Sequence, residues 1–187
     1  ELQKSIAHVG YQNIVLDSLK STIYLKNAGM KIGFGSIGKG YAADKGREIM
    51  ERSGVKGGIV NASGDMAMWG NPPKQKFWKI GVGNPFHSNK MVKTLKIKSG
   101  AVVTSGSTQK FVEFEGVRYS HIINPNTGYP STGLTSVSIY GPSAEFANAL
   151  STSIMVLGAE RGEKLMRRFP KYRYIFISDD GNISKSR

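Results

Sequence analysis

The feature that most constrains this chain is a cluster of glycines between an apolar run and a helical pattern. Four glycines stand within eight residues; they are Gly33, Gly35, Gly38 and Gly40. The pattern predicts a short strand over residues 30–34 that turns sharply into a helix over residues 41–53. Such a turn brings backbone N–H groups and the positive end of the helix dipole to one point. That point suits an anion, and phosphate is the usual one.

The rest of the chain has mainly the pattern of short strands. Two further helices are expected at residues 143–157 and 160–169, the end of a helix within residues 1–9, and a loop at residues 84–89. Strands are expected at residues 13–19, 21–25, 58–61, 66–69, 77–82, 91–97, 101–104, 111–114, 118–123, 135–140 and 172–177. The 187 residues therefore predict one α+β domain, with a largely antiparallel sheet and about three helices.

The glycine cluster alone leaves three interpretations open. Gly33, Gly35 and Gly38 spell the G-x-G-x-x-G of a Rossmann dinucleotide site, but that site needs alternating strands and helices on a parallel sheet. A P-loop needs Ser or Thr after its lysine to hold Mg²⁺, whereas Gly40 follows Lys39 here. A purely structural tight turn is the third interpretation.

Two other segments carry candidate site residues. The turn at residues 61–65 places Gly64 and Asp65 at the end of a buried strand, where a backbone can approach a ligand closely. The alternative is a turn in which Asp65 caps its own backbone. His121 stands on a strand that ends in a turn at residues 124–128. It is either a functional group or a hydrogen-bonded structural residue.

A polar stripe runs along the helix predicted at residues 143–157. Asn148, Ser151 and Thr152 lie three to four residues apart on this stripe. Oxygen ligands at that spacing can bind a hard cation such as Mg²⁺, although neutral Asn and Ser are poor substitutes for carboxylates. The alternative is a stripe that packs on a neighbouring element.

The net charge of the chain is +13, with Lys and Arg spread along the sequence rather than gathered in a block. This distribution favours a solvated basic surface; attraction to an acidic ligand, an acidic protein or an anionic membrane comes next, and nucleic-acid binding is disfavoured. There is no cysteine, which excludes disulfides and thiolate metal sites. No apolar run approaches the roughly 20 residues that span a bilayer.

Five segments, taken in order, resemble the FAD:protein FMN transferase (ApbE) family. They are GSIGKGYAADKG, GIVNASGDMAMWG, TSGS, RYSHIINPNTGYP and AEFANALSTSIMVLGAERG. The resemblance runs from Val9 to the C-terminus. It implies an ApbE-like, T-fold-related single domain over residues 1–187 that lacks the N-terminal portion of the family. Because the chain begins at Glu1 rather than methionine, we expect residues upstream of it.

The resemblance implies transfer of an FMN moiety from FAD to a Thr or Ser hydroxyl of a target flavoprotein, with release of AMP. Some family members instead hydrolyse FAD to FMN and AMP. Both reactions attack the FAD pyrophosphate and need its charge neutralised, which Mg²⁺ and a lysine provide. FAD and a target flavoprotein are therefore the expected partners, and Mg²⁺ the expected cofactor. The family also implies export to the bacterial periplasm and a lipid anchor on the outer face of the inner membrane.

The resemblance also implies roles for individual residues. The implied catalytic residues are His121 and Lys39. The implied FAD-binding positions are Gly33, Gly35, Ser36, Gly38, Lys39, Gly40, Tyr41, Gly64, Asp65, His121 and Ile123. The implied metal positions are Ser36, through its backbone oxygen, and Asn148, Ser151 and Thr152.

Four positions depart from the family pattern. The family usually has Asp where this chain has Asn148, and many members have a carboxylate at the position of Gly33. It usually has Asp at the position of Asn124 and often Arg at that of Asn126. Besides a Mg²⁺-dependent transferase, the departures at Asn148 and Gly33 leave open a second hypothesis: a family member that binds FAD or a partner with little or no catalysis. A third hypothesis, a nucleic-acid-binding module, is based on the net charge alone.

Overall fold

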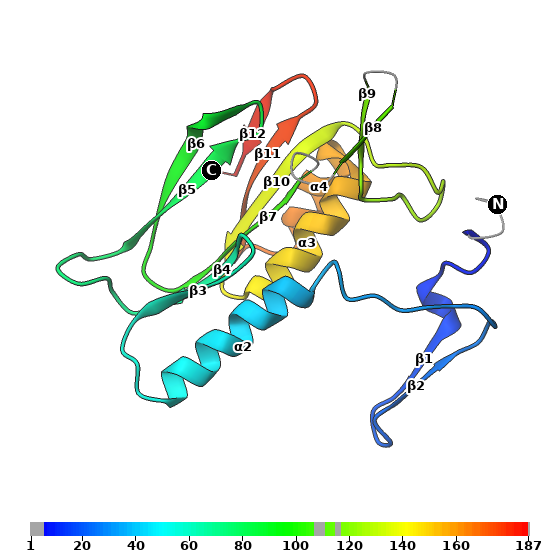
Figure 1. Cartoon of the computed structure of the whole chain (residues 1–187), viewed down its shortest axis with the longest axis horizontal. Helices are drawn as coiled ribbons and strands as arrows, with labels where there is room; N and C mark the ends of the chain where they lie inside the picture. Colours follow the sequence, from blue (N-terminus) through cyan, green and yellow to red (C-terminus); the bar gives the residue numbers. More distant parts are fainter. Residues whose placement is uncertain (1–5, 107–110, 115–116, 187) are drawn as a thin grey trace.

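The computed structural model describes residues 6–106, 111–114 and 117–186. Its centre is a sheet that has six strands within these residues (Figure 1). In spatial order they are β12 (Ile183–Lys185), β11 (Arg173–Ser178), β10 (Leu134–Gly141), β7 (Gly100–Gly106), β4 (Asp65–Trp69) and β3 (Gly58–Ala62). All neighbouring strands of this sheet pair antiparallel. The described residues therefore lack the parallel scaffold of a Rossmann site.

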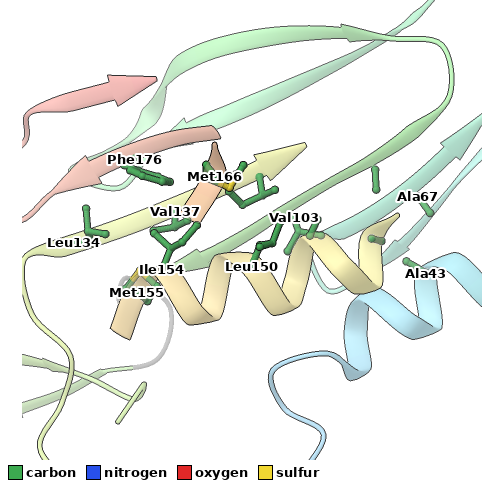
Figure 2. Packing of buried hydrophobic residues seen from close by; sticks show 14 residues of the cluster. Ala43, Ala67, Val103, Leu134, Val137, Leu150, Ile154, Met155, Met166 and Phe176 are labelled. Carbon is green, nitrogen blue, oxygen red and sulfur yellow. The ribbon is translucent and has the colours of Figure 1, made fainter. Parts of the chain in front are cut away.

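Helices cover one face of this sheet. They are α2 (Gly38–Arg52), α3 (Ala144–Leu157) and α4 (Ala159–Met166). A cluster of buried apolar side chains lies between them and the strands (Figure 2); among its members are Ala43, Val103, Val137, Leu150, Ile154, Met166 and Phe176. Leu150 and Ile154 stand four residues apart, on one side of α3, and this apolar side packs on the sheet.

A two-stranded ribbon packs on the opposite face. It consists of β5 (Trp78–Asn84) and β6 (His87–Ile97). Ile80 and Val82 are buried and alternate with exposed residues along β5. Together with Leu95 they form a second apolar cluster with Val102 and Ile175 of the sheet. Because successive side chains of a strand point to opposite sides, the ribbon can bury one side and expose the other.

Two further hairpins lie outside the central sheet. They are β1 (Ile14–Asp17) with β2 (Thr22–Leu25), and β8 (Phe111–Phe114) with β9 (Val117–Ser120). A 3₁₀ turn, η1 (Tyr11–Asn13), precedes β1. The β1–β2 hairpin stands apart from the helices and the sheet, and residues 26–37 join it to α2 (Figure 1). Among the described helices, none has the length and apolar character needed to cross a membrane.

Gly40 marks a close contact between α2 and α3. A β-carbon at this position would lie 2.3 Å from the backbone oxygen of Ala144. Gly40 is buried, and its N–H donates to Oδ1 of Asn148 on α3 at 3.3 Å. Asn148 thereby binds one of the N–H groups that the first turn of α2 leaves without a partner in its own helix.

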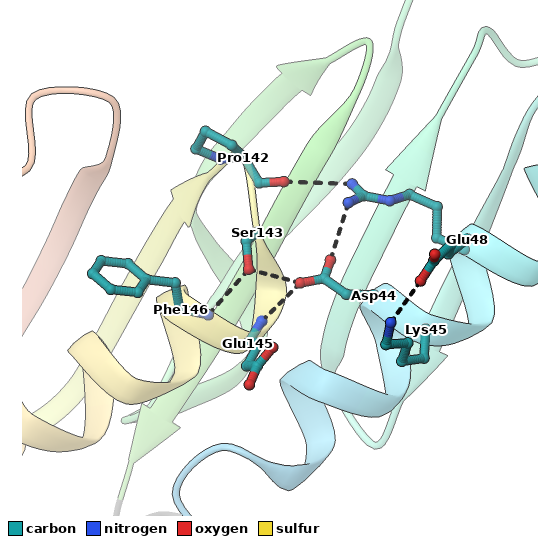
Figure 3. Close-up of polar contacts among 8 residues, drawn as sticks. Asp44, Lys45, Glu48, Pro142, Ser143, Glu145 and Phe146 are labelled. Atoms are coloured by element: carbon teal, nitrogen blue, oxygen red, sulfur yellow. Dashed lines mark hydrogen bonds and ion pairs between the residues drawn. The ribbon is translucent and has the colours of Figure 1, made fainter. Parts of the chain in front are cut away.

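The start of α3 is held in turn by α2. Ser143 caps α3, since its Oγ accepts the N–H of Phe146 at 3.1 Å. Oδ2 of Asp44 on α2 accepts the Ser143 hydroxyl at 2.7 Å and the N–H of Glu145 at 3.0 Å (Figure 3). Nη2 of Arg47 lies 3.3 Å from the other carboxylate oxygen of Asp44, Oδ1. Each helix therefore supplies a polar side chain to the N-terminus of the other.

The structure confirms the predicted α+β class and the antiparallel sheet. It also has about the expected number of helices. The first of these helices begins at Gly38, three residues before the predicted start at residue 41. Its glycine-rich first turn is a poor helix former by itself. The contact with α3 at Gly40 and Asn148 supplies the stabilisation that the local sequence lacks.

Some predicted elements are wrong or were missed. The predicted strand over residues 30–34 is wrong, because the segment has no pairing strand among the described residues and exposes Ile32 and Phe34. The loop predicted at residues 84–89 is shorter, since β6 already begins at His87. The three-residue β12 was not predicted, because so short a strand carries no periodic signal. The helix end predicted within residues 1–9 falls largely outside the described residues.

Replacing Gly40 by alanine should strongly destabilise the fold. The added methyl group would meet the Ala144 backbone, which cannot move without shifting α3. We expect Gly40→Ala to lower the free energy of unfolding by about 3 kcal/mol, at the upper end of the range for overpacking. Urea unfolding followed by circular dichroism measures the change.

Gly33→Ala is the matched control within the same glycine cluster. A β-carbon at Gly33 meets no atom within 4 Å, and the backbone there is not left-handed. Its effect should stay within about 0.5 kcal/mol. Equal effects of the two substitutions would show that the cluster serves backbone conformation rather than helix packing.

Candidate active site

A cleft of about 1130 Å³ opens where the start of α2 meets α3 and the end of β7. The turn between β3 and β4 and the segment at residues 121–126 also contribute to its wall. Among the described residues that line it, Lys39 is the single Lys or Arg, and none is Asp or Glu. The cleft is therefore large enough for a nucleotide-sized ligand and carries a positive group that attracts an anion.

Some backbone N–H groups in the segment that leads into α2 already have hydrogen-bond acceptors within the protein. The N–H groups of Ile37 and Gly38 both donate to the Phe34 oxygen, at 3.2 and 2.6 Å. The N–H of Gly40 is bound to Asn148. The helix start therefore offers fewer backbone donors to an anion than the sequence suggested, and the charge of Lys39 matters more.

Lys39 forms an ion pair with a buried carboxylate. Its Nζ lies 3.3 Å from Oδ2 of Asp65. The Asp65 side chain is 1% exposed, whereas that of Lys39 is 44% exposed and lines the cleft. Burial raises the pKa of Asp65 above its usual value, and the Lys39 ammonium acts in the opposite direction. The pair thus places a cation at the cleft wall with its counter-charge buried beside it.

The β3–β4 turn that precedes Asp65 is closed by another residue. Oδ1 of Asn61 accepts the N–H of Gly64 at 2.8 Å. Ser63 and Gly64 both have left-handed backbones, with φ of 52° and 97°. Asn61, rather than Asp65, is therefore the residue that caps this turn. The Asp65 carboxylate remains available for the ion pair with Lys39.

Ser105 joins the predicted polar residues of α3. Its Oγ lies 2.8 Å from Oγ of Ser151 and 3.3 Å from Oγ1 of Thr152. Ser151 is fully buried and also donates to the Asn148 backbone oxygen at 3.0 Å. The sequence-based site did not include Ser105. Its position in the hydroxyl-rich segment TSGS, at the end of the strand β7, is the signal that could have found it.

The segment after β9 brings His121 to the cleft. Oγ of Ser120 accepts the N–H of Ile122 at 3.1 Å and so fixes the backbone on both sides of the histidine. The Asn124 backbone oxygen accepts the N–H of Gly128 at 2.8 Å, which confirms the turn predicted there. His121 itself is exposed and lines the cleft.

The structure gathers many of the predicted site residues around this cleft. Those that line it are Gly35, Ser36, Lys39, Gly64, His121, Ile123, Asn148 and Thr152. Those that do not line it are Gly33, Gly38, Gly40, Tyr41, Asp65 and Ser151.

The predicted residues outside the lining differ in their surroundings. Gly33 is exposed with open space around it, and Gly40 is packed against α3. Tyr41 is 49% exposed, with Nζ of Lys45 5.9 Å from its ring centre. Asp65 and Ser151 are buried and reach the cleft only through their neighbours Lys39 and Ser105.

The oxygen donors at the predicted metal positions are neutral. Ser36, Asn148 and Thr152 line the cleft, and the Asn148 amide oxygen already accepts a hydrogen bond from Gly40. The described residues contain no group of three or more His, Cys, Asp or Glu side chains that could hold a metal ion. Oxygen is the donor that Mg²⁺ prefers, but these residues bring no negative charge to offset its dehydration. A divalent cation here would need that charge from a ligand.

Comparison with known proteins places this geometry in a family. A model described as the ApbE family matches residues 1–176. The FAD:protein FMN transferase of Treponema pallidum is 34% identical over 175 residues, which are 88% of this chain and 48% of that protein. The FAD:protein FMN transferase of Escherichia coli K12 is 30% identical over 184 residues, which are 96% of this chain and 52% of that protein.

Solved structures show the same similarity. The crystal structure of the ApbE protein from Thermotoga maritima superimposes with a TM-score of 0.91 at 35% identity, over 99% of this chain and 60% of that one. The flavin transferase ApbE from Vibrio cholerae gives a TM-score of 0.85 at 25% identity, over 99% and 59%. The chain thus spans about half the length of the curated relatives it matches.

Asn148 should stabilise the fold through its contact with Gly40. Asn148→Ala leaves the buried Gly40 N–H without an acceptor, so we expect it to lower the free energy of unfolding by about 1–3 kcal/mol. Asn148→Asp keeps an acceptor beside a helix N-terminus, where negative charge is favourable, and should retain stability. Urea unfolding of the three proteins measures both effects.

Ser153→Ala is the control on the same helix. Ser153 is exposed at the cleft, so its loss should change stability by less than about 0.5 kcal/mol. If Asn148→Ala were equally silent, the contact between α2 and α3 would not depend on this amide.

Proposed function

The chain belongs to the ApbE family, and we propose that it transfers an FMN moiety from FAD to a Thr or Ser hydroxyl of a target flavoprotein, with release of AMP. The curated relatives named above are FAD:protein FMN transferases. The observation that carries the proposal is the cleft itself, whose single lysine stands among hydroxyls with no carboxylate in the described lining. Such a lining favours a polyanionic ligand such as a pyrophosphate over a cationic one.

The proposed reaction is a displacement at phosphorus. The hydroxyl oxygen of the target attacks the phosphorus of the FMN half, and the bond from that phosphorus to the bridging pyrophosphate oxygen breaks. AMP leaves with this oxygen. Lys39 neutralises charge on the phosphate oxygens, which is where electrostatic stabilisation contributes most to phosphoryl transfer. His121 lines the same cleft and is assigned the proton of the attacking hydroxyl.

We propose that Mg²⁺ enters this site only together with FAD. Ser36, Asn148, Ser151 and Thr152 are the assigned positions; Ser36, Asn148 and Thr152 supply oxygens at the cleft, and Ser151 lies buried behind them. Mg²⁺ in nucleotide sites is commonly held by one or two protein groups plus substrate phosphates. Since the side chains here are neutral, the pyrophosphate of FAD must supply the negative charge. When bound, the ion would withdraw charge from the phosphate oxygens.

The wider assignments rest on the family resemblance. We propose that residues 1–187 act as a single flavin transferase domain. We also propose that the protein is exported and lipid-anchored at the outer face of a bacterial inner membrane, where a target flavoprotein meets the cleft. Fractionation of cells that produce the natural protein would test this location, and recovery in the cytoplasm would contradict it.

Incubation with FAD, Mg²⁺ and a target flavoprotein should release AMP and add the mass of FMN to the target. Chromatography of nucleotides and intact-protein mass spectrometry measure the two products. Lys39→Met should lower the rate about 10²–10³-fold, comparable to the loss of one donor in an electrostatic site. Lys45→Met, on the exposed side of the same helix, should leave the rate unchanged.

A second candidate is a family member that hydrolyses FAD or only binds it, and the neutral Asn148 favours weak catalysis. AMP release without a mass shift on any target would indicate FAD hydrolysis. Tight FAD binding without AMP release would indicate a binding protein. If the chain neither binds FAD nor releases AMP, the proposed function is wrong.

Asn148→Asp should create a Mg²⁺ site that no longer depends on FAD. A carboxylate at this position supplies the charge that the neutral amide lacks. In calorimetric titrations we expect the unchanged chain to take up Mg²⁺ only when FAD is present, and Asn148→Asp to take it up alone. Ser153→Asp, which also adds a carboxylate to the cleft side of α3, is the control. Strong Mg²⁺ binding by the unchanged chain without FAD would contradict the proposal.

A further inference from the structure

We propose that Asp65 is a positioning residue: it holds the Lys39 ammonium at the cleft wall and does not itself touch the ligand. The identity of the ligand as a flavin nucleotide rests on the proposed function. The ion pair itself is a property of the protein without ligand, because it joins two side chains of the same chain at 3.3 Å.

The burial of Asp65 separates it from the ligand. Asp65 does not line the cleft, although Lys39, Gly64 and Thr104 around it do. Its side chain is 1% exposed, and both carboxylate oxygens are shielded from solvent. A ligand in the cleft therefore meets Lys39 rather than the carboxylate beside it.

Asp65 has little other support. Apart from Lys39, the group that favours its charged form is a backbone N–H, that of Thr104, and its effect on the Asp65 pKa is smaller than that of the lysine. The β3–β4 turn is capped by Asn61, so Asp65 is not needed for that purpose. A buried carboxylate without a partner is costly, which makes the nearby ammonium its main stabilising contact.

The ion pair also restricts Lys39. A half-exposed lysine has several freely rotating bonds, and ordering such a side chain on binding costs about 0.5–1.5 kcal/mol. An ammonium that the carboxylate already holds in place has lost most of this freedom before the ligand arrives. That gain corresponds to a change in affinity of about 2–10-fold. This gain in affinity applies only to ligands whose phosphate groups contact Lys39.

The first test is a stability cycle on the unliganded 187-residue chain. Urea unfolding compares the unchanged protein with Lys39→Met, Asp65→Asn and the double variant. Lys39→Met should destabilise the protein, since it leaves the carboxylate buried alone, and Asp65→Asn should restore stability in that background. Lys45→Met is the control, because Lys45 pairs with Glu48 at the surface of the same helix. Additive effects of the two substitutions would overturn the proposal.

The second test compares binding of FAD with binding of riboflavin, which lacks phosphate, by flavin fluorescence. Asp65→Asn should weaken FAD binding about 2–10-fold and leave riboflavin binding unchanged. In the Lys39→Met background the same substitution should have no further effect on FAD. Equal weakening of both ligands, or a further loss in the double variant, would show that Asp65 contacts the ligand or acts on the whole cleft, and would overturn the proposal.

The two tests separate this inference from the proposed function. If the unchanged chain binds no flavin, the proposed function fails, and inorganic pyrophosphate replaces FAD as the probe of Lys39. The stability cycle still decides whether Asp65 and Lys39 act as a pair. If FAD binds but the stability cycle is additive, the proposed function stands and the positioning role is wrong.

Discussion

The crossing of α2 and α3 is the contact on which the rest of the structure depends. Gly40 lets the two backbones approach to a distance that no β-carbon would tolerate. At this crossing each helix satisfies the N-terminus of the other: Asn148 of α3 accepts from the start of α2, and Asp44 of α2 accepts from the start of α3. Unpaired N–H groups at buried helix ends are costly, so this exchange fixes both the position and the direction of the helices.

The same crossing shapes the cleft. Because α2 begins where it touches α3, its first turn borders the same cleft as the end of β7, and Lys39 lines the cleft from there. The neighbouring β3–β4 turn places Asp65 beside the Lys39 ammonium. Residues far apart in the chain thus meet through one helix contact and one turn. A lysine held by a buried carboxylate is a directed cation rather than a freely moving one, which suits the recognition of a pyrophosphate.

Much of the fold could be predicted, but the site only in part. The fold class and most of the helices and strands follow from the spacing of apolar residues, with period two in strands and period 3.6 in helices. This spacing is visible in the local sequence because each element buries one of its faces. The segment at residues 30–34 has the apolar character of a strand but no partner to pair with among the described residues, and pairing is not written in local sequence. Ser105 was missed since its role depends on a neighbour 46 positions away, Ser151.

The sequence by itself determined the α+β class, the glycine-rich start of a helix, the basic charge and the order of motifs that resembles the ApbE family. These are local or additive properties of the chain. The tertiary structure decided what the glycines are for: Gly40 permits helix contact, whereas Gly33 faces open space. It also decided that Asn148 binds a helix start and that Asp65 is buried beside Lys39. Such roles arise from burial and from distances between remote segments, and no local pattern encodes them.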